Sequence, residues 1–115
     1  MKDPRLYLTH ILECVERIEL YTKDGKEEFL ASIQIQDSVY RNFEIIGEAS
    51  KRVSIEMKTI SPEVPWKDIA GFRDVLIHQY DGIDPNEVWA VIAEYLPGLK
   101  VSLVRLMALA KIQAQ

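Results

Sequence analysis

The stretch LTHILECVERIELY, residues 8–21, decides the fold class of the chain. Its apolar side chains recur every three or four residues, which is the spacing of one helix face and not the alternation of a β-strand. Asp3-Pro4 precedes it as an N-cap with proline at the first helical position, and the turn Lys23-Asp24-Gly25-Lys26 ends it. We therefore predict a first amphipathic helix. Its apolar positions are Leu8, Ile11, Leu12, Val15, Ile18 and Tyr21.

A second helical stripe extends over about Glu27 to Met57, and it allows a break near Ser32 to Gln36. Asn42 and Gly47 interrupt this stripe. Because glycine has no side chain, a neighbouring helix can approach closely at Gly47. We therefore expect a crowded contact there. The apolar positions of the stripe are Ile35, Val39, Ile46, Ala49 and Val53.

Two prolines and the absence of a helical period predict a connecting loop from Thr59 to Pro65. A third helix is expected from Trp66 to Tyr80, and Asp81-Gly82 closes it. Its apolar positions are Trp66, Ile69, Ala70, Phe72, Leu76, Ile77 and Tyr80.

The clearest helix start in the chain is Asp84-Pro85-Asn86-Glu87, an acidic N-cap followed by proline and then glutamate. An apolar stripe continues from it to the C-terminus. We expect a kink at Pro97-Gly98 and fraying from Ile112 to Gln115. No strand pattern competes, so the sequence predicts an all-α protein, a four- to five-helix up-and-down bundle. The apolar positions of this last stripe are Val88, Ile92, Tyr95, Leu99, Leu103, Leu106 and Ala110.

Composition limits both organisation and partners. The 115 residues fit one domain, 1–115, and 48% hydrophobic residues allow a real core. The single cysteine cannot form an internal disulfide, and no apolar stretch is typical of a signal peptide or membrane span, so a cytoplasmic location is the expectation. The formal net charge of −4 argues against tight, non-specific binding to polyanions.

Arg73, Asp74 and His78 are the candidates for chemistry within the third helix. Arg73 shares a helix face with Ile69 and Ile77, so its guanidinium needs an anion, either a carboxylate such as Glu48 or a phosphate. Asp74 lies four residues before His78 and can orient its imidazole. On an ideal helix, however, Arg73 and His78 lie roughly 140° apart. To act on one phosphate, the two residues need long side chains that reach around a groove, a helix that loosens before Gly82, or a second copy of the chain that completes the site. A dimer is the natural solution.

Other candidates have simpler interpretations. His10 and Cys14 have the i, i+4 spacing of metal ligands, but no second pair completes the set, and Cys14 is better explained as a small core residue. Glu44, Glu48 and Arg52 form a ladder typical of ion pairs on a helix surface. The aromatic residues Trp66, Trp89 and Tyr95 are expected in the core or at an interface.

The run GFRDVLIHQY, residues 71–80, resembles the R-x-x-x-x-H-x-Y signature of HepT-like proteins, a minimal all-helical branch of the HEPN superfamily. Further landmarks occur in the family's order. The resemblance implies a metal-independent endoribonuclease without cofactor, the toxin of a toxin–antitoxin module, which acts as a homodimer with its RNA cleft between the subunits. These landmarks are Ile46-Gly47-Glu48-Ala49, Lys51-Arg52, Val64-Pro65-Trp66, Ile69, Gly71 and Val88-Trp89.

The resemblance also implies roles for single residues. His78 would be the general acid/base, and Arg73 would stabilise charge on the phosphoryl group. Asp74 stands where many relatives have Asn, and it would favour a protonated His78; Glu48 would position Arg73. The cognate MNT-type nucleotidyltransferase antitoxin would AMPylate Tyr80 and so exclude RNA. The alternative is a non-catalytic helical nucleotide-binding or dimerisation partner of a minimal nucleotidyltransferase.

Overall fold

The computed structural model describes residues 5–113, except for the side chains of residue 80 and residues 111–113. Within this part the chain forms helices and no strand, which confirms the all-α prediction. The predicted helix start at Asp3-Pro4 lies outside the described residues, as do the last two residues of the segment expected to fray. The elements are α1 (Leu6–Tyr21), α2 (Lys26–Ala31), α3 (Ile33–Arg52), α4 (Ile55–Ile60), α5 (Trp66–His78), the short 3₁₀-helix η1 (Tyr80–Gly82), α6 (Pro85–Glu94) and α7 (Leu96–Gln113).

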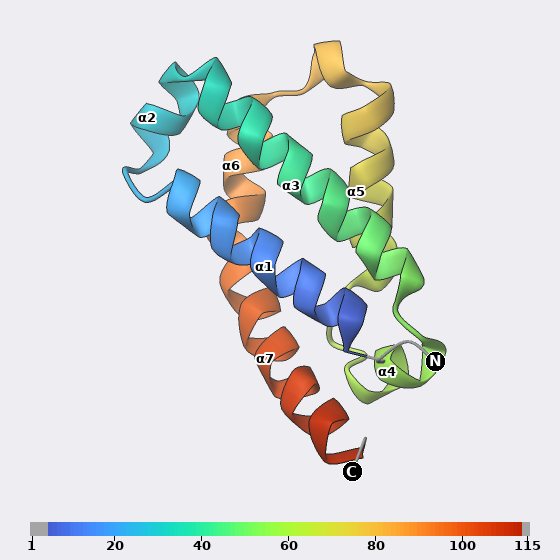
Figure 1. Ribbon diagram of the computed structural model, residues 1–115. Coiled ribbons are helices and arrows are strands. Elements are labelled where there is room, and N and C mark those ends of the chain that lie inside the picture. Colours follow the sequence, from blue (N-terminus) through green and yellow to red (C-terminus); the bar gives the residue numbers. More distant parts are fainter. Residues whose placement is uncertain (1–4, 114–115) are drawn as a thin grey trace.

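Helix α3 lies between α1 and α5, and it contacts both along its length (Figure 1). Helices α6 and α7 follow one another behind α1, and the short helices α2 and α4 lie at opposite ends of α3 (Figure 1). Every described α-helix contributes to one hydrophobic core. Figure 1 shows no other described helix in front of the layer of α1, α3 and α5.

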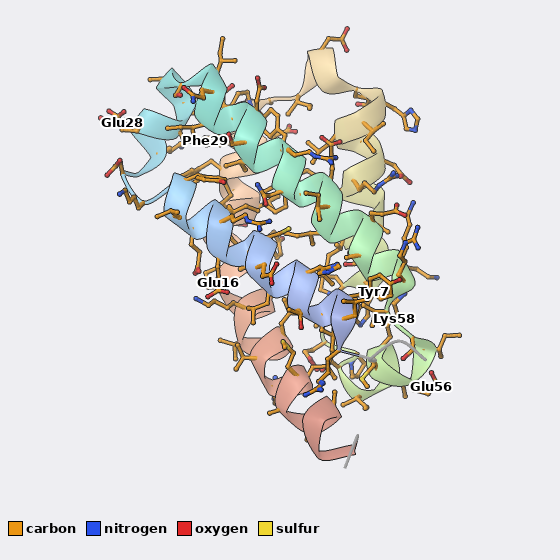
Figure 2. The ribbon with its side chains drawn as sticks, in the orientation of Figure 1. Tyr7, Glu16, Glu28, Phe29, Glu56 and Lys58 are labelled. Carbon is orange, nitrogen blue, oxygen red and sulfur yellow. The ribbon has the colours of Figure 1, made fainter. Side chains whose placement is uncertain are left out.

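The apolar stripe predicted for α1 faces the core. Leu8, Ile11, Val15 and Ile18 are fully buried, whereas Tyr21, at the end of the helix, is exposed. Figure 2 shows Phe29 pointing from α2 into the bundle, where its ring packs against that of Trp89 at 5.6 Å between centroids. Burial of such apolar surface is the main favourable term in folding this bundle.

The second predicted helix is divided in the structure into α2, α3 and the start of α4, and the first break lies at Ser32, as the pattern allowed. Ser32 has extended backbone angles, and its hydroxyl accepts a hydrogen bond from the Ile35 amide at 3.1 Å. The side-chain Nε2 of Gln36 donates to the backbone carbonyls of Phe29 and Leu30 at 3.0 and 3.1 Å. These bonds satisfy groups that both helix ends would leave unpaired.

The predicted end of this helix at Met57 is wrong. Helix α3 ends at Arg52, Val53 is extended, and the Ser54 hydroxyl caps α4 by accepting from the Met57 amide at 3.2 Å. The apolar pattern could not show this break, because Val53 and Met57 are buried on both sides of it. The connecting loop predicted from Thr59 to Pro65 is shorter than expected, because α4 extends to Ile60.

Helix α5 ends at His78, before the predicted end at Asp81-Gly82, and η1 occupies residues 80–82. The next helix start is confirmed: Asp84 caps α6, and its carboxylate accepts from the Asn86 amide at 2.9 Å. The 3₁₀-helix η1 and the Asp84 cap thus set where the chain leaves α5 and where α6 begins.

The kink predicted at Pro97-Gly98 is instead a break at Tyr95, between α6 and α7. Pro97 is the second residue of α7, where a helix does not need its missing amide proton. The break changes the direction of side chains, so Tyr95 is 62% exposed although it belongs to the predicted stripe. Within the described residues, no helix is both long and apolar enough to span a membrane.

Candidate active site

Arg73 lies at a close approach of α5 to α3, next to Gly47. A β-carbon built on Gly47 would overlap the β-carbon of Arg73 and would lie 3.1 Å from its Cγ. Such contacts exceed what a packed interior accommodates without displacement. Glycine at position 47 therefore permits this approach. The crowded contact predicted at Gly47 is confirmed, and Arg73 is its partner.

Alternating charges connect α3 with α5 around Arg73. Arg73 Nε lies 3.3 Å from Glu48 Oε2, and Arg73 Nη1 donates to Asp74 Oδ1 at 3.1 Å. The same Asp74 oxygen accepts from Lys51 Nζ at 3.5 Å. Glu48 Oε1 in turn accepts from Arg52 Nε and Nη2 at 3.4 and 3.3 Å. Two carboxylates thus hold the Arg73 guanidinium in one place.

Exposure differs between the members of this network. The Arg73 side chain is 25% exposed, whereas that of Asp74 is 51% exposed. Desolvation alone raises the pKa of the Asp74 carboxyl, but the Lys51 ammonium and the Arg73 guanidinium outweigh it and hold this pKa below its ordinary value. The Tyr7 hydroxyl and the Glu48 carboxylate raise the pKa of Arg52. Asp74 therefore remains anionic at neutral pH.

A groove of about 280 Å³ opens between α1, α3 and α5, and Arg73 lines it together with Ile77, four residues later. Glu48, the predicted partner of Arg73, also lines this groove. Figure 2 shows Tyr7 on α1 near the C-terminal part of α3, at the α1 wall of the same groove. The other charged lining residues are Arg41, Glu44 and Arg52, and His10 lines the α1 side.

His78 does not line the groove. It is the last residue of α5 and is exposed, and no hydrogen bond or ion pair joins it to another described side chain. Asp74 forms no hydrogen bond or ion pair with His78, because its carboxylate is directed to Arg73 and Lys51 instead. The structure therefore brings Arg73, Asp74 and Glu48 together and leaves His78 apart, as the angle of roughly 140° on an ideal helix requires. The Tyr80 backbone belongs to η1, but its side chain lies outside the described part.

Comparisons with known proteins place the chain in a family. The family model described as "Ribonuclease HepT-like" matches residues 11–106. The chain belongs to the ribonuclease HepT-like family. A Thermococcus cleftensis protein named "Probable ribonuclease HepT" is 43% identical over 95 residues, which cover 82% of this chain and 86% of that protein. A Caldanaerobacter subterraneus protein named "Putative RNase" is 42% identical over 101 residues, covering 87% of this chain and 90% of its own length.

A longer relative comes from Methanocaldococcus jannaschii and is named "Gamma-glutamylcyclotransferase and putative RNase". It is 44% identical over 107 residues, which cover 92% of this chain but 48% of that protein. The HepT-like chain therefore spans about half the length of this relative. No solved structure matches the chain.

The sequence did not single out two residues of the groove, Tyr7 and Arg41. A signal for Arg41 was present, because residues 41, 45, 48 and 52 recur every three or four positions and so form one ridge on α3. Tyr7 showed no such signal, since its position beside α3 depends on how the helices pack. Both belong to the surface that the HepT-like chain presents next to Arg73.

The second histidine of this HepT-like chain, His10, is exposed, whereas Cys14 on the same helix is buried. Burial raises the pKa of the Cys14 thiol, which makes the metal-binding thiolate harder to form. In the described part of the chain, no group of three His, Cys, Asp or Glu side chains could hold a metal ion. Cys14 is a small core residue, as the simpler interpretation expected.

Proposed function

We propose that the chain is an endoribonuclease toxin in which Arg73 and His78 act on one phosphodiester of RNA. The supporting observation is the fixed Arg73 guanidinium at the wall of an open groove. Two carboxylates bind Arg73 Nε and Nη1, so Nη2 stays available to an anion. A fixed cation beside a groove is suited to stabilising charge that develops on a phosphoryl group.

In the proposed reaction, a base removes the proton of the ribose 2′-hydroxyl, and the 2′-oxygen attacks the adjacent phosphorus. The bond from phosphorus to the 5′-oxygen breaks, and this oxygen takes a proton. The products are a 2′,3′-cyclic phosphate and a 5′-hydroxyl end. His78 supplies or accepts one of these protons, since an imidazole can act as a general acid or a general base. RNA provides the nucleophile, so the proposed mechanism requires no metal or cofactor.

The proposed enzyme is a homodimer. Within one chain, His78 lies outside the groove that Arg73 lines, so one α5 does not present both side chains to the same phosphate. Two α5 helices brought together would place Arg73 and His78 of different copies at one cleft. Single-chain activity would contradict this part of the proposal, and sedimentation combined with activity at low protein concentration tests it.

Regulation by an MNT-type nucleotidyltransferase antitoxin is a further part of the proposal. Tyr80 follows α5 closely in η1, two residues after His78. Transfer of AMP to its hydroxyl would add bulk and negative charge near His78 and repel RNA. Mass spectrometry after incubation with the antitoxin and ATP should show added AMP, and Tyr80→Phe should prevent this modification.

The decisive experiment is cleavage of RNA by the purified protein in excess chelator. Wild type should cut, whereas Arg73→Ala and His78→Ala should not; Arg105→Ala, an exposed arginine on α7, is the matched control. Absence of cleavage, or cleavage that both active-site variants retain, would contradict the proposal.

One observation favours the alternative, a non-catalytic helical partner of a nucleotidyltransferase. Arg73 already has two carboxylate neighbours, as a purely structural arginine would. In that case Arg73→Ala should weaken assembly with the nucleotidyltransferase, measured by size-exclusion chromatography, and no RNA would be cut.

A further inference from the structure

The groove between α1, α3 and α5 contains more cationic groups than the proposed cleavage chemistry requires. Arg41, Arg52 and Arg73 line it against two carboxylates, Glu44 and Glu48. The chain as a whole has a formal net charge of −4. A local excess of positive charge in an acidic protein attracts phosphate to that place and not to the remaining surface.

The arginines of the groove differ in their partners. Arg52 directs Nε and Nη2 to Glu48 and also interacts with the Tyr7 hydroxyl. Arg41 is exposed, and no hydrogen bond or ion pair joins it to another described side chain. Phosphate oxygens can therefore bind Arg41 without displacing any of the contacts among Glu48, Arg52 and Arg73.

The α1 wall of the groove is aromatic. The rings of Tyr7 and His10 meet edge to face, with 6.1 Å between centroids and 87° between planes. Both line the groove, and His10 is exposed. Aromatic side chains beside cationic ones are the combination by which proteins bind single-stranded nucleic acid, because bases stack on the rings while phosphates meet the cations.

The size of the groove limits what it can hold. Its volume of about 280 Å³ lies just below the range of ligand pockets, which hold roughly 300–1,000 Å³. One nucleotide fits such a space, and a double helix does not.

We propose that this groove binds one nucleotide unit of single-stranded RNA, with its base against Tyr7 and His10 and a flanking phosphate on Arg41. The groove would thus be a subsite that positions the RNA strand beside Arg73. This inference rests on the proposed function, since it concerns the RNA that Arg73 and His78 would cut.

The test is binding of a fluorescent, fully 2′-O-methylated single-stranded RNA decamer to the full chain, measured by anisotropy. The methyl groups remove the nucleophile, so binding is separate from cleavage. Tyr7→Ala should weaken binding roughly 5- to 150-fold, as expected for one lost stacking aromatic, and Tyr7→Phe should restore it. His10→Ala, at an exposed position, should also weaken binding and serves if Tyr7→Ala fails to fold.

Arg41→Ala tests the phosphate contact. It should lower the slope of log binding constant against log salt concentration by about 0.7, the contribution of one phosphate on a single strand. Arg105→Ala on α7 and the exposed Tyr95→Ala are matched controls outside the groove and should bind like wild type.

Three outcomes would overturn the inference. The Arg41→Ala and His10→Ala variants could both bind the decamer as tightly as wild type does. Alternatively, the protein could bind duplex and single-stranded RNA equally well, or bind free AMP as tightly as the decamer. A protein that fails to cut unmodified RNA, yet loses decamer binding in these variants, would support the groove while contradicting the ribonuclease proposal. A protein that cuts RNA, with variants that bind normally, would contradict the groove alone.

Discussion

Arg73 and His78 lie on the same helix but in opposite surroundings. Arg73 packs against Gly47 and contacts the carboxylates of Glu48 and Asp74. His78 is exposed at the end of α5, and no hydrogen bond or ion pair fixes it among the described residues. The comparison shows that one chain provides a preorganised cation, whereas the proposed acid/base is left for something else to position. Preorganisation of the charge-stabilising group is what electrostatic catalysis requires.

The largest expected effect comes from removing the exposed side chain of His78. His78→Ala should reduce RNA cleavage by about 10²- to 10⁴-fold, the usual contribution of a general acid or base. Because the imidazole is exposed, the free energy of unfolding should change by less than about 0.5 kcal/mol. Single-turnover cleavage and urea denaturation measure the two quantities. If His78→Ala destabilised the fold enough to account for the lost activity, His78 would be a structural residue, and its contrast with Arg73 would not hold.

Gly47→Ala should disturb the packing of Arg73 against α3. The added methyl group overlaps the β-carbon of Arg73, so α3 and α5 must separate, and overpacking of this kind costs about 1–3 kcal/mol. Urea denaturation measures this loss. Gly71→Ala is a matched control, because a β-carbon there meets nothing within 4 Å and alanine favours the helix. A more stable Gly47→Ala protein would mean that the close approach is not needed.

Arg73→Ala should separate charge from packing. Alanine keeps the β-carbon that lies over Gly47 and loses only partly exposed ion pairs, so stability should fall by at most about 1 kcal/mol. Cleavage should fall far more. Thermal unfolding followed by circular dichroism, beside the cleavage assay, compares the two. Severe unfolding would show that Arg73 is mainly a structural residue.

The smallest effect concerns pH. The pKa of Asp74 is lowered in the folded chain, so its contribution to stability is present above the ordinary carboxyl pKa and is lost as pH falls through the lowered value. Asp74→Asn should therefore flatten the acid limb of stability below about pH 4 and leave the limb above pH 7 unchanged. Salt should shrink the difference, since the group is exposed. Identical acid limbs in the two proteins would contradict this ionic role.

Periodicity predicted the helices well where one face is buried along a whole element. The stripe of α1 and the cap at Asp84 are both confirmed, because helix spacing and capping are local properties. Predictions failed at Met57 and Tyr95, where one apolar pattern continues across two helices. Such a pattern records burial, and two short helices on the same core bury their residues as one long helix would.

The site shows the same division. Arg73, Asp74 and Glu48 could be proposed from spacing and from the family's signature, and the structure places them in contact. The hydrogen bond expected between Asp74 and His78 is replaced by contacts of Asp74 with Lys51 and Arg73. Spacing of four residues allows a contact, but a cation on the neighbouring helix attracts the carboxylate more strongly.

The sequence by itself determined an all-α chain of the ribonuclease HepT-like family and the angular separation of Arg73 from His78, because helix period and motif are written in consecutive residues. Only the tertiary structure decided that Gly47 lets Arg73 approach α3 and that Tyr7 and Arg41 share its groove. These contacts join residues far apart in the chain, and they depend on how closely helices pack, which no local pattern specifies.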